Sequence, residues 1–192
     1  EIGLSLNDKT VSWNEFWKMI NSFNRDIVEP TSNRYFFVDE PEKIKIHGYE
    51  PKTELKLDLH PDFPKRGQRS FKLNDEFLIS KADFEKLDKN KLHRLIDCLN
   101  FKFEKGKIVF DSEDYEAYQK SKNKGSIIQW VPSKDDNLKI EIVLEGNKIS
   151  KGIGESSMCS LKEGDIVQLQ RKFFARVDSI KNNKMKFYYL HK

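Results

Sequence analysis

Cysteine is scarce in this sequence, and the two that occur lie far apart. Cys98 and Cys159 form no CxxC motif and have no histidine at the spacing of metal ligands. This pattern argues against both a disulfide framework and a zinc site. We therefore expect a reduced setting in the cytoplasm.

Long apolar runs are also missing. None approaches the roughly 20 residues of a membrane-spanning helix, and Glu1–Leu4 lacks the basic and apolar regions of a signal peptide. The 192 residues are 37% hydrophobic and 34% charged, which is typical of one soluble domain or two small ones without a membrane partner. The absence of an initiating Met indicates that Glu1 is an internal cut.

The usual catalytic motifs do not occur. The sequence has no phosphate-binding GxxxxGK[ST] or GxGxxG loop, no HExxH and no GxSxG. Its four histidines are scattered without the spacing of metal ligands. We expect a binding module that has no catalytic residue, metal site or cofactor of its own.

Positive charge is concentrated in the last third of the chain. The net charge is +4, and residues 121–192 hold 14 basic and 8 acidic residues. Lysine and arginine gain affinity for nucleic acids by displacing counterions from phosphates. The distribution favours a polyanionic partner such as RNA, although a lysine-rich genome produces the same excess.

Ser12–Ile27 has the pattern of an amphipathic helix. Its aromatic and aliphatic residues recur every three or four positions and form one stripe: Trp13, Phe16, Trp17, Ile20, Phe23 and Ile27. Ser12 and Glu15 form a capping box at its start, and Pro30 ends it. We expect this stripe to pack on a core.

After Pro30 the pattern changes to short strand-like runs separated by turn residues. The expected strands of the first part are Tyr35–Val38, Lys43–His47, Glu54–Leu59, Ser70–Leu73, Glu76–Ile79, Phe101–Phe103 and Lys107–Phe110. Helical segments are expected at Ser80–Leu87 and Lys91–Leu99.

The lysine-rich stretch Tyr118–Gly125 is the expected boundary, because little in it can be buried. Strands are expected again at Ser126–Val131, Leu138–Leu144, Asp165–Leu169, Phe173–Val177 and Lys184–Leu190, with Gly152 and Gly154 among the turn residues between them. The whole chain therefore predicts a mainly β fold of two successive small barrels or sandwiches.

Three segments mix arginine with aromatic or amide residues: Asn33–Phe37, Lys65–Arg69 and Gln168–Phe174. Such mixtures recognise single-stranded RNA, because bases stack on aromatic or guanidinium planes while Arg and Gln bond to their edges. The alternative is that the aromatics are strand residues that face a core, and composition favours that alternative.

The same segments resemble the anticodon-binding region of archaeal-type glutamyl-tRNA synthetases. The resemblance rests on NRYFFV at 33–38, LHPDFPKRG at 59–67, GSIIQWV at 125–131 and QLQR at 168–171. The third element is similar to one shared with glutaminyl-tRNA synthetases. One departure is Phe173, where the family usually has Gly two residues after the arginine of the fourth element.

The resemblance implies two consecutive antiparallel β-barrels of the glutaminyl-tRNA synthetase anticodon-binding type, preceded by a short helical connector. The implied domains are 1–33 (connector), 34–120 (first barrel) and 121–192 (second barrel), with strand exchange between the barrels allowed.

By the match of motifs, the residues implied to bind the anticodon or the tRNA are Arg34, Gln168 and Arg171, together with Lys81, Lys86 and Arg94. The implied partners are tRNA-Glu, with tRNA-Gln as an alternative, and the catalytic domain of the same polypeptide, but not DNA. ATP and Mg²⁺ belong to the full-length ligase. Because the nucleotide-binding signatures of class I synthetases are absent, we expect this chain alone not to activate glutamate.

Two alternatives remain at this stage. One is the anticodon-binding region of a glutaminyl-tRNA synthetase. The residues Tyr35–Phe37 after Arg34 resemble the archaeal glutamyl group more closely and so favour that group. The other is a protein of a different class: either an RNA-binding barrel of the ribosomal type, in which the helix has no evident purpose, or a protein-interaction module that uses the aromatic helix Trp13–Ile27.

Overall fold

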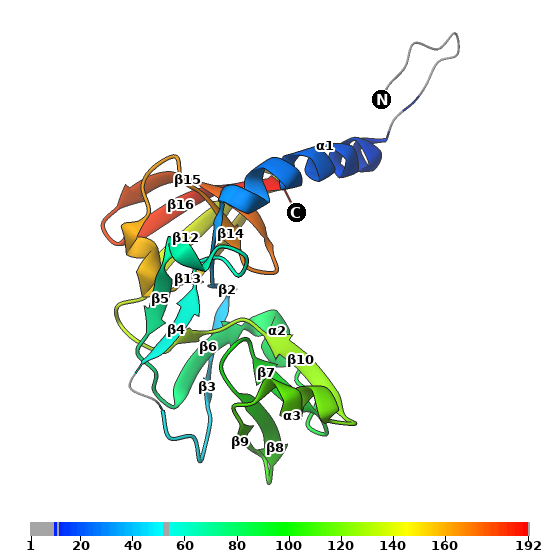
Figure 1. The fold of residues 1–192 in the computed structure, drawn as a ribbon, viewed down its shortest axis with the longest axis vertical. Helices are drawn as coiled ribbons and strands as arrows, with labels where there is room; N and C mark the ends of the chain where they lie inside the picture. Colours follow the sequence, from blue (N-terminus) through cyan, green and yellow to red (C-terminus); the bar gives the residue numbers. More distant parts are fainter. Residues whose placement is uncertain (1–9, 11, 52–53, 192) are drawn as a thin grey trace.

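The computed structural model describes residues 10, 12–51 and 54–191, and these form a mainly β protein. The molecule is elongated, with helix α1 (Trp13–Val28) at one end and strands β8 (Asn100–Glu104) and β9 (Lys107–Ser112) at the other (Figure 1). None of the described helices is long and apolar enough to cross a membrane.

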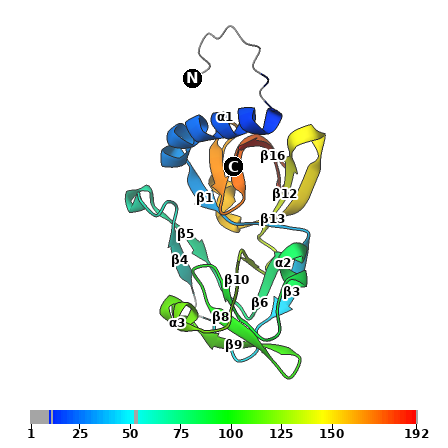
Figure 2. The ribbon, with the colours of Figure 1, turned by 90° about the vertical axis from the view of Figure 1, so that its right-hand side faces the viewer.

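One sheet of seven strands curls into a near-closed barrel, in the order β1-β14-β15-β16-β12-β13-β2. These strands are β1 (Asn33–Tyr35), β14 (Ile166–Leu169), β15 (Phe173–Lys181), β16 (Lys184–His191), β12 (Leu138–Val143), β13 (Ile149–Gly154) and β2 (Phe37–Asp39). The edge strands β1 and β2 are separated along the chain by Phe36 alone. The chain itself therefore holds the two edges together and closes the sheet (Figure 2).

The remaining strands form three smaller sheets, which we call the three-sheet lobe. Their orders are β10-β7-β8-β9, β11-β6-β3 and β4-β5. The strands not yet given are β3 (Pro41–Lys45), β4 (Leu55–Asp58), β5 (Gln68–Phe71), β6 (Glu76–Ser80), β7 (Leu92–Leu95), β10 (Lys124–Ile128) and β11 (Val131–Pro132). The lobe also carries the short helices α2 (Lys81–Glu85) and α3 (Tyr115–Lys120).

Four short 3₁₀ turns complete the described elements: η1 (Glu29–Thr31), η2 (Pro64–Arg66), η3 (Glu145–Asn147) and η4 (Ser156–Ser160). Most strand pairs are antiparallel, but β1·β14, β12·β16 and β10·β7 run parallel. Parallel neighbours need long connections, so strands distant in sequence meet in both parts of the molecule.

The segment from Tyr35 to Val38 serves two hydrophobic cores at once. Phe36 and Val38 belong to the core of the three-sheet lobe, whereas Tyr35 and Phe37 belong to the core of the seven-stranded barrel. Successive side chains of an extended chain point to opposite faces. One aromatic run can therefore anchor both cores, and its rings are buried rather than presented to RNA.

Most of the expected strands are confirmed, but the expectation for Lys91–Leu99 is wrong. This stretch is strand β7, which pairs with β8 and β10, and a turn follows in which Asp97 has φ +52°. Leu95 is fully buried within the three-sheet lobe. Packing between two neighbouring strands therefore outweighs the local helical pattern.

The glycines at 152 and 154 lie inside strand β13 and not in a turn. A Cβ at residue 152 would overlap the Val38 carbonyl oxygen and the Phe37 ring, and one at residue 154 would overlap Met158. These glycines allow β13 to approach β2 and the turn η4 closely.

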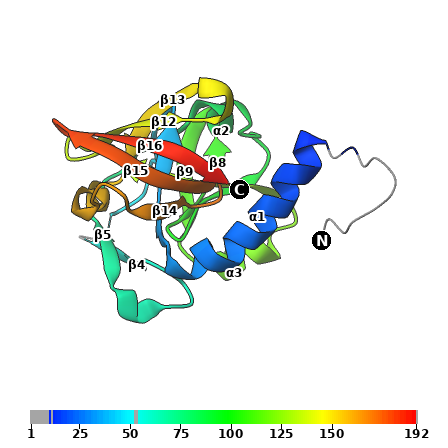
Figure 3. The same cartoon turned by 90° about the horizontal axis from the view of Figure 1, so that it is seen from above.

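Helix α1 begins as expected, but its apolar stripe is only partly covered. Ser12 and Glu15 form the capping box, and Trp17 lines a pocket together with Tyr188, Tyr189 and Leu190 of β16. Figure 3 shows α1 beside the end of the barrel at which the C-terminus lies. Phe23 and Ile27 are 61% and 71% exposed. The expectation of a core-facing stripe therefore holds only for part of the helix, and the side chain of Trp13 lies outside the described residues.

A buried ion pair joins the three-sheet lobe to the seven-stranded barrel. Arg69 on β5 donates through Nη1 to Glu155 Oε2 at 2.7 Å, and the same oxygen accepts the Phe36 amide N–H at 2.7 Å. Both charged side chains are almost fully buried. Burial raises the pKa of Glu155, and the Arg69 charge and hydrogen bonds from Ser157 and Phe36 oppose that rise.

A second buried polar group, His93, connects β7 to β10. Its Nδ1 accepts the Ser126 amide N–H at 3.0 Å, so Nε2, which lies 2.9 Å from the Asp88 carbonyl oxygen, donates the other hydrogen bond. A Cβ at residue 125 would overlap the imidazole ring, which accounts for Gly125. Burial lowers the pKa of His93, and the hydrogen bond to the Asp88 carbonyl oxygen opposes that shift.

Replacing Arg69 with Met should leave the Glu155 carboxylate buried without its cation. The expected loss is about 3–5 kcal/mol in the free energy of unfolding, measured by chemical denaturation. The double variant Arg69→Met/Glu155→Gln should lose less than the sum of the two single variants, because it no longer buries an unpaired charge. Strictly additive losses would contradict the assigned pairing.

The free energy of unfolding should fall as the pH drops below 6.5, the ordinary pKa of histidine, towards the lower pKa of folded His93. A depressed folded-state pKa means that the unfolded chain binds the proton more readily, so this contribution is present above the ordinary pKa and lost below it. The slope of stability against pH in this window should be smaller in His93→Gln. An identical slope in both proteins would show that His93 is not the responsible group.

Candidate nucleic-acid interface

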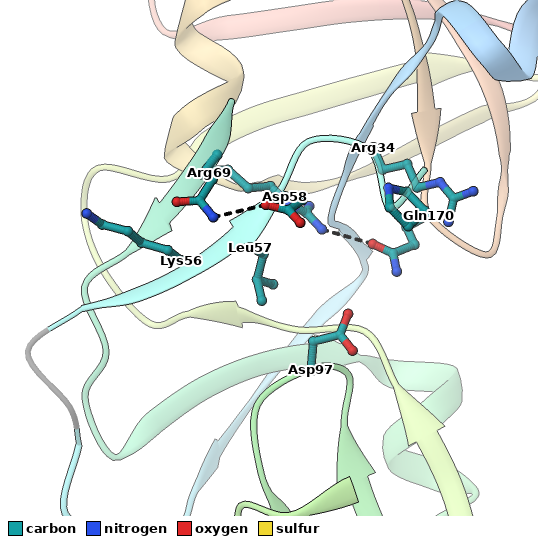
Figure 4. Close-up of a pocket in the computed structure, with 9 residues that line it drawn as sticks. Arg34, Lys56, Leu57, Asp58, Arg69, Asp97 and Gln170 are labelled. Carbon is teal, nitrogen blue, oxygen red and sulfur yellow. Dashed lines mark hydrogen bonds between the residues drawn. The ribbon is translucent and has the colours of Figure 1, made fainter. Parts of the chain in front are cut away.

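A polar cleft of about 440 Å³ opens between the three-sheet lobe and the seven-stranded barrel (Figure 4). The residues that line it are Arg34, Lys56, Leu57, Asp58, Pro61, Gln68, Arg69, Asp97 and Gln170. They come from β1, the β4–β5 hairpin, the turn after β7 and the turn after β14. Cations and carboxylates both face the cleft, so it can donate hydrogen bonds to a ligand and also accept them.

Arg34 lies on β1 at the rim of this cleft, directly opposite Gln168 of β14 in the parallel register. The structure therefore brings together two of the residues that the sequence singled out. Arg34 Nη2 lies 3.4 Å from Glu29 Oε1, a long and correspondingly weak contact. A hydrogen bond from Arg25 lowers the pKa of Glu29, and the charge of Arg34 adds to this lowering.

The loop between β4 and β5 fixes the start of β1. The Arg34 amide donates to the Leu59 carbonyl at 2.7 Å, and His60 Nε2 lies 3.2 Å from the Glu29 carbonyl oxygen. The Arg66 guanidinium donates to the Pro30 carbonyl. This is the LHPDFPKRG segment, and its role here is to hold the chain that leads into Arg34.

Arg171 lies in the turn between β14 and β15, and its side chain is exposed. The turn is closed by hydrogen bonds from the Gln170 amide to the Tyr35 carbonyl and from the Lys172 amide to the Leu169 carbonyl. Arg171 has φ +61°, a left-handed conformation that is uncommon for a side chain of this size. Phe173, the departure from the family pattern, begins β15 and packs on Tyr189 with ring centres 5.2 Å apart.

The three other predicted site residues differ in their surroundings. Lys81 begins α2, Lys86 follows its end, and both side chains are exposed. Arg94 is buried, and its Nη1 donates to Asn100 Oδ1 at 2.8 Å and to the Glu113 carbonyl at 3.1 Å. Its guanidinium is thus already engaged inside the three-sheet lobe.

The sequence places Arg69 and Gln170 in two of the candidate recognition segments, Lys65–Arg69 and Gln168–Phe174, but did not assign either of them a role as a site residue. Arg69 Nη2 donates to Gln170 Oε1 at 2.9 Å across the cleft, and its guanidinium lies 4.3 Å from the centre of the Phe36 ring. Arg69 ends the basic tract Lys65–Arg69 and lies on the short strand β5, so the sequence indicated a surface cation there. Only the pairing with Glu155 shows that Arg69 is buried and orders the cleft.

Comparison with known proteins gives matches along most of the chain. Two family profiles, both described as the anti-codon binding domain of class I tRNA synthetases (E and Q), match residues 32–117 and 127–178. The segments carrying Arg34, Arg69, Gln168 and Arg171 all fall within these matches.

Curated relatives align with the whole chain. A glutamate–tRNA ligase of Methanobrevibacter smithii is 38% identical over 193 residues, and one of Pyrococcus furiosus is 38% identical over 201. A third, from Methanocaldococcus jannaschii, is 30% identical over 195. In each case all of this chain aligns with 33% of the relative, so the chain spans about a third of their length.

The two profile matches and the curated relatives indicate the same family. The mainly β fold with its near-closed barrel is consistent with that family. They cover the strands on both sides of the cleft and the turn that holds Arg171. The chain belongs to the family of anticodon-binding domains of class I glutamyl- and glutaminyl-tRNA synthetases.

Proposed function

We propose that this chain recognises the anticodon of tRNA-Glu as part of a glutamate–tRNA ligase in the cytoplasm. The observation that carries the proposal is the register of Arg34 opposite Gln168, at a polar cleft between the two parts of the molecule. Arg donates in a planar fork, and Gln both donates and accepts. Together they suit the edges of unstacked bases.

The proposed roles follow from exposure. Arg34, Gln168 and the exposed Arg171 contact anticodon bases, whereas the exposed Lys81 and Lys86 contact phosphates. Arg94 acts indirectly, because its contacts to Asn100 and Glu113 hold β7, β8 and the segment before α3 in place. Phosphate contacts supply affinity that is independent of sequence and sensitive to salt.

The remaining two thirds of the ligase would supply the chemistry. Three relatives that this chain matches are called glutamate–tRNA ligase and are about three times as long. We assign glutamate activation, with ATP and Mg²⁺, to that other part of the same polypeptide. The exposed stripe of α1, with Phe23 and Ile27, is a suitable face for packing against it.

Substituting Arg34 or Arg171 with Ala should each weaken binding of tRNA-Glu, since each removes donors aimed at base edges. The expected loss is roughly tenfold per arginine, measured by fluorescence anisotropy at fixed salt. Arg176→Ala is the matched control, because Arg176 is also exposed but lies on β15 and is not among the residues that line the cleft.

The decisive measurement compares the affinity for tRNA-Glu with the affinity for tRNAs whose anticodon has been altered. Wild type should lose affinity when the anticodon changes, and the two variants should lose this discrimination while Arg176→Ala keeps it. Binding that ignored the anticodon in wild type would favour the ribosomal-type alternative and contradict the proposal.

A further inference from the structure

Gln129 carries a buried carboxamide that has no protein partner. The residue is 7% exposed, and neither Nε2 nor Oε1 makes a hydrogen bond to any described residue. An amide without partners loses its hydration and gains nothing in return, so such groups are rare in folded proteins. An orphan amide at the wall of a pocket indicates that a ligand supplies the missing bonds.

The backbone holds Gln129 firmly between β10 and β11. Its neighbours Ile128 and Trp130 are fully buried in the core of the three-sheet lobe, and the Trp130 indole N–H donates to the Ile96 carbonyl at 2.8 Å. Side chains alternate in extended chain, so Gln129 faces away from that core. Its carboxamide is therefore pre-positioned on a rigid element.

The Gln129 side chain lines a second pocket, of about 270 Å³, between the two parts of the molecule. The lobe contributes Ser80, Ala82, Asp83, Ile127 and Gln129, and the barrel contributes Asp39, Arg171 and Lys172. Ligand sites for larger small molecules span roughly 300–1,000 Å³. This pocket fits one planar base rather than a bulkier ligand.

Most of the polar groups in this pocket already have partners. Lys172 pairs with Asp39, and the Ser80 hydroxyl bonds to the Asp83 carboxylate at 2.7 Å. Arg171 has no hydrogen bond or ion pair to the described residues, and its φ of +61° stores backbone strain. Gln129 and Arg171 are therefore the polar pocket residues whose side chains make no hydrogen bond to the described residues.

We propose that Gln129 and Arg171 together recognise one anticodon base that carries a carbonyl oxygen, which means uracil, guanine or cytosine. This inference rests on the function proposed above and adds a residue and a base class to it. The Arg171 guanidinium only donates, so it requires an acceptor such as a carbonyl oxygen. The Gln129 amide accepts from one atom of the base edge and donates to its neighbour. In uracil and guanine these are the imino N–H and a carbonyl oxygen, and in cytosine they are the amino group and the ring nitrogen N3.

Other ligands fit this pair less well. A phosphate has no proton for the Gln129 oxygen at neutral pH, which would leave that atom buried and unpaired. Adenine carries no carbonyl oxygen for the donor-only guanidinium. The mixed amide and the cation together thus discriminate between bases, which phosphate contacts do not.

The test uses anticodon stem-loop RNAs in which each of the three anticodon positions is varied among the four bases. Wild type should bind uracil, guanine or cytosine more tightly than adenine at one position, measured by fluorescence anisotropy. Gln129→Leu should reduce affinity for the preferred bases roughly tenfold and abolish the preference at that position alone. Preferences at the other two positions should stay as in wild type.

A stability measurement separates this role from a structural one. Gln129→Leu replaces an unpaired amide with an apolar side chain of similar size, so its melting temperature should be equal to or higher than that of wild type. The isosteric Gln129→Glu offers the base only acceptors and should also abolish the preference for a carbonyl. Gln119→Leu, an exposed glutamine on α3, is the matched control and should change nothing.

Failure of the inference about Gln129 can be distinguished from failure of the proposed function. If wild type discriminates between anticodons but Gln129→Leu and Gln129→Glu keep the full preference, the inference about Gln129 is overturned and the proposed function stands. If wild type itself binds all stem-loops equally, the proposed function fails, and this inference fails with it.

Discussion

The fold depends on the buried contact between Arg69, Glu155 and the Phe36 amide. Arg69 comes from the β4–β5 hairpin, Glu155 from the segment that follows β13, and Phe36 from the junction of β1 and β2. At these three points the three-sheet lobe meets the seven-stranded barrel. A buried pair is costly unless every partner is present. The contact therefore fixes how the two parts are placed, and with them the cleft that Arg69 orders through Gln170.

The same geometry explains why candidate base-binding groups gather at this junction. Alternation along Asn33–Val38 sends Phe36 and Val38 into one core and Tyr35 and Phe37 into the other, which leaves Arg34 at the rim between them. The parallel pairing of β1 with β14 then sets Gln168 beside Arg34, and the following turn carries Arg171. Rigid packing on both sides means that little order has to be gained when a ligand binds.

Sequence patterns predicted the elements whose signals are local. The capping box at Ser12, most of the strands and the mainly β class follow from spacing and turn residues alone. The patterns failed where segments distant in sequence determine the structure. Lys91–Leu99 contains strand β7 because it pairs with β8 and β10, and the glycines at 152 and 154 are explained by close contacts with β2 and η4. For the same reason, no local signal distinguished the buried Arg69 and the orphan amide of Gln129 from ordinary polar surface residues.

We propose that the anticodon binds between the three-sheet lobe and the seven-stranded barrel. Chemical footprinting of tRNA-Glu with wild-type chain tests this most directly, because it reports which bases lose access to base-specific probes. Protection of the anticodon bases, with the acceptor arm left fully reactive, is the predicted result. An anticodon that stays reactive while other parts of the tRNA are protected would contradict the account.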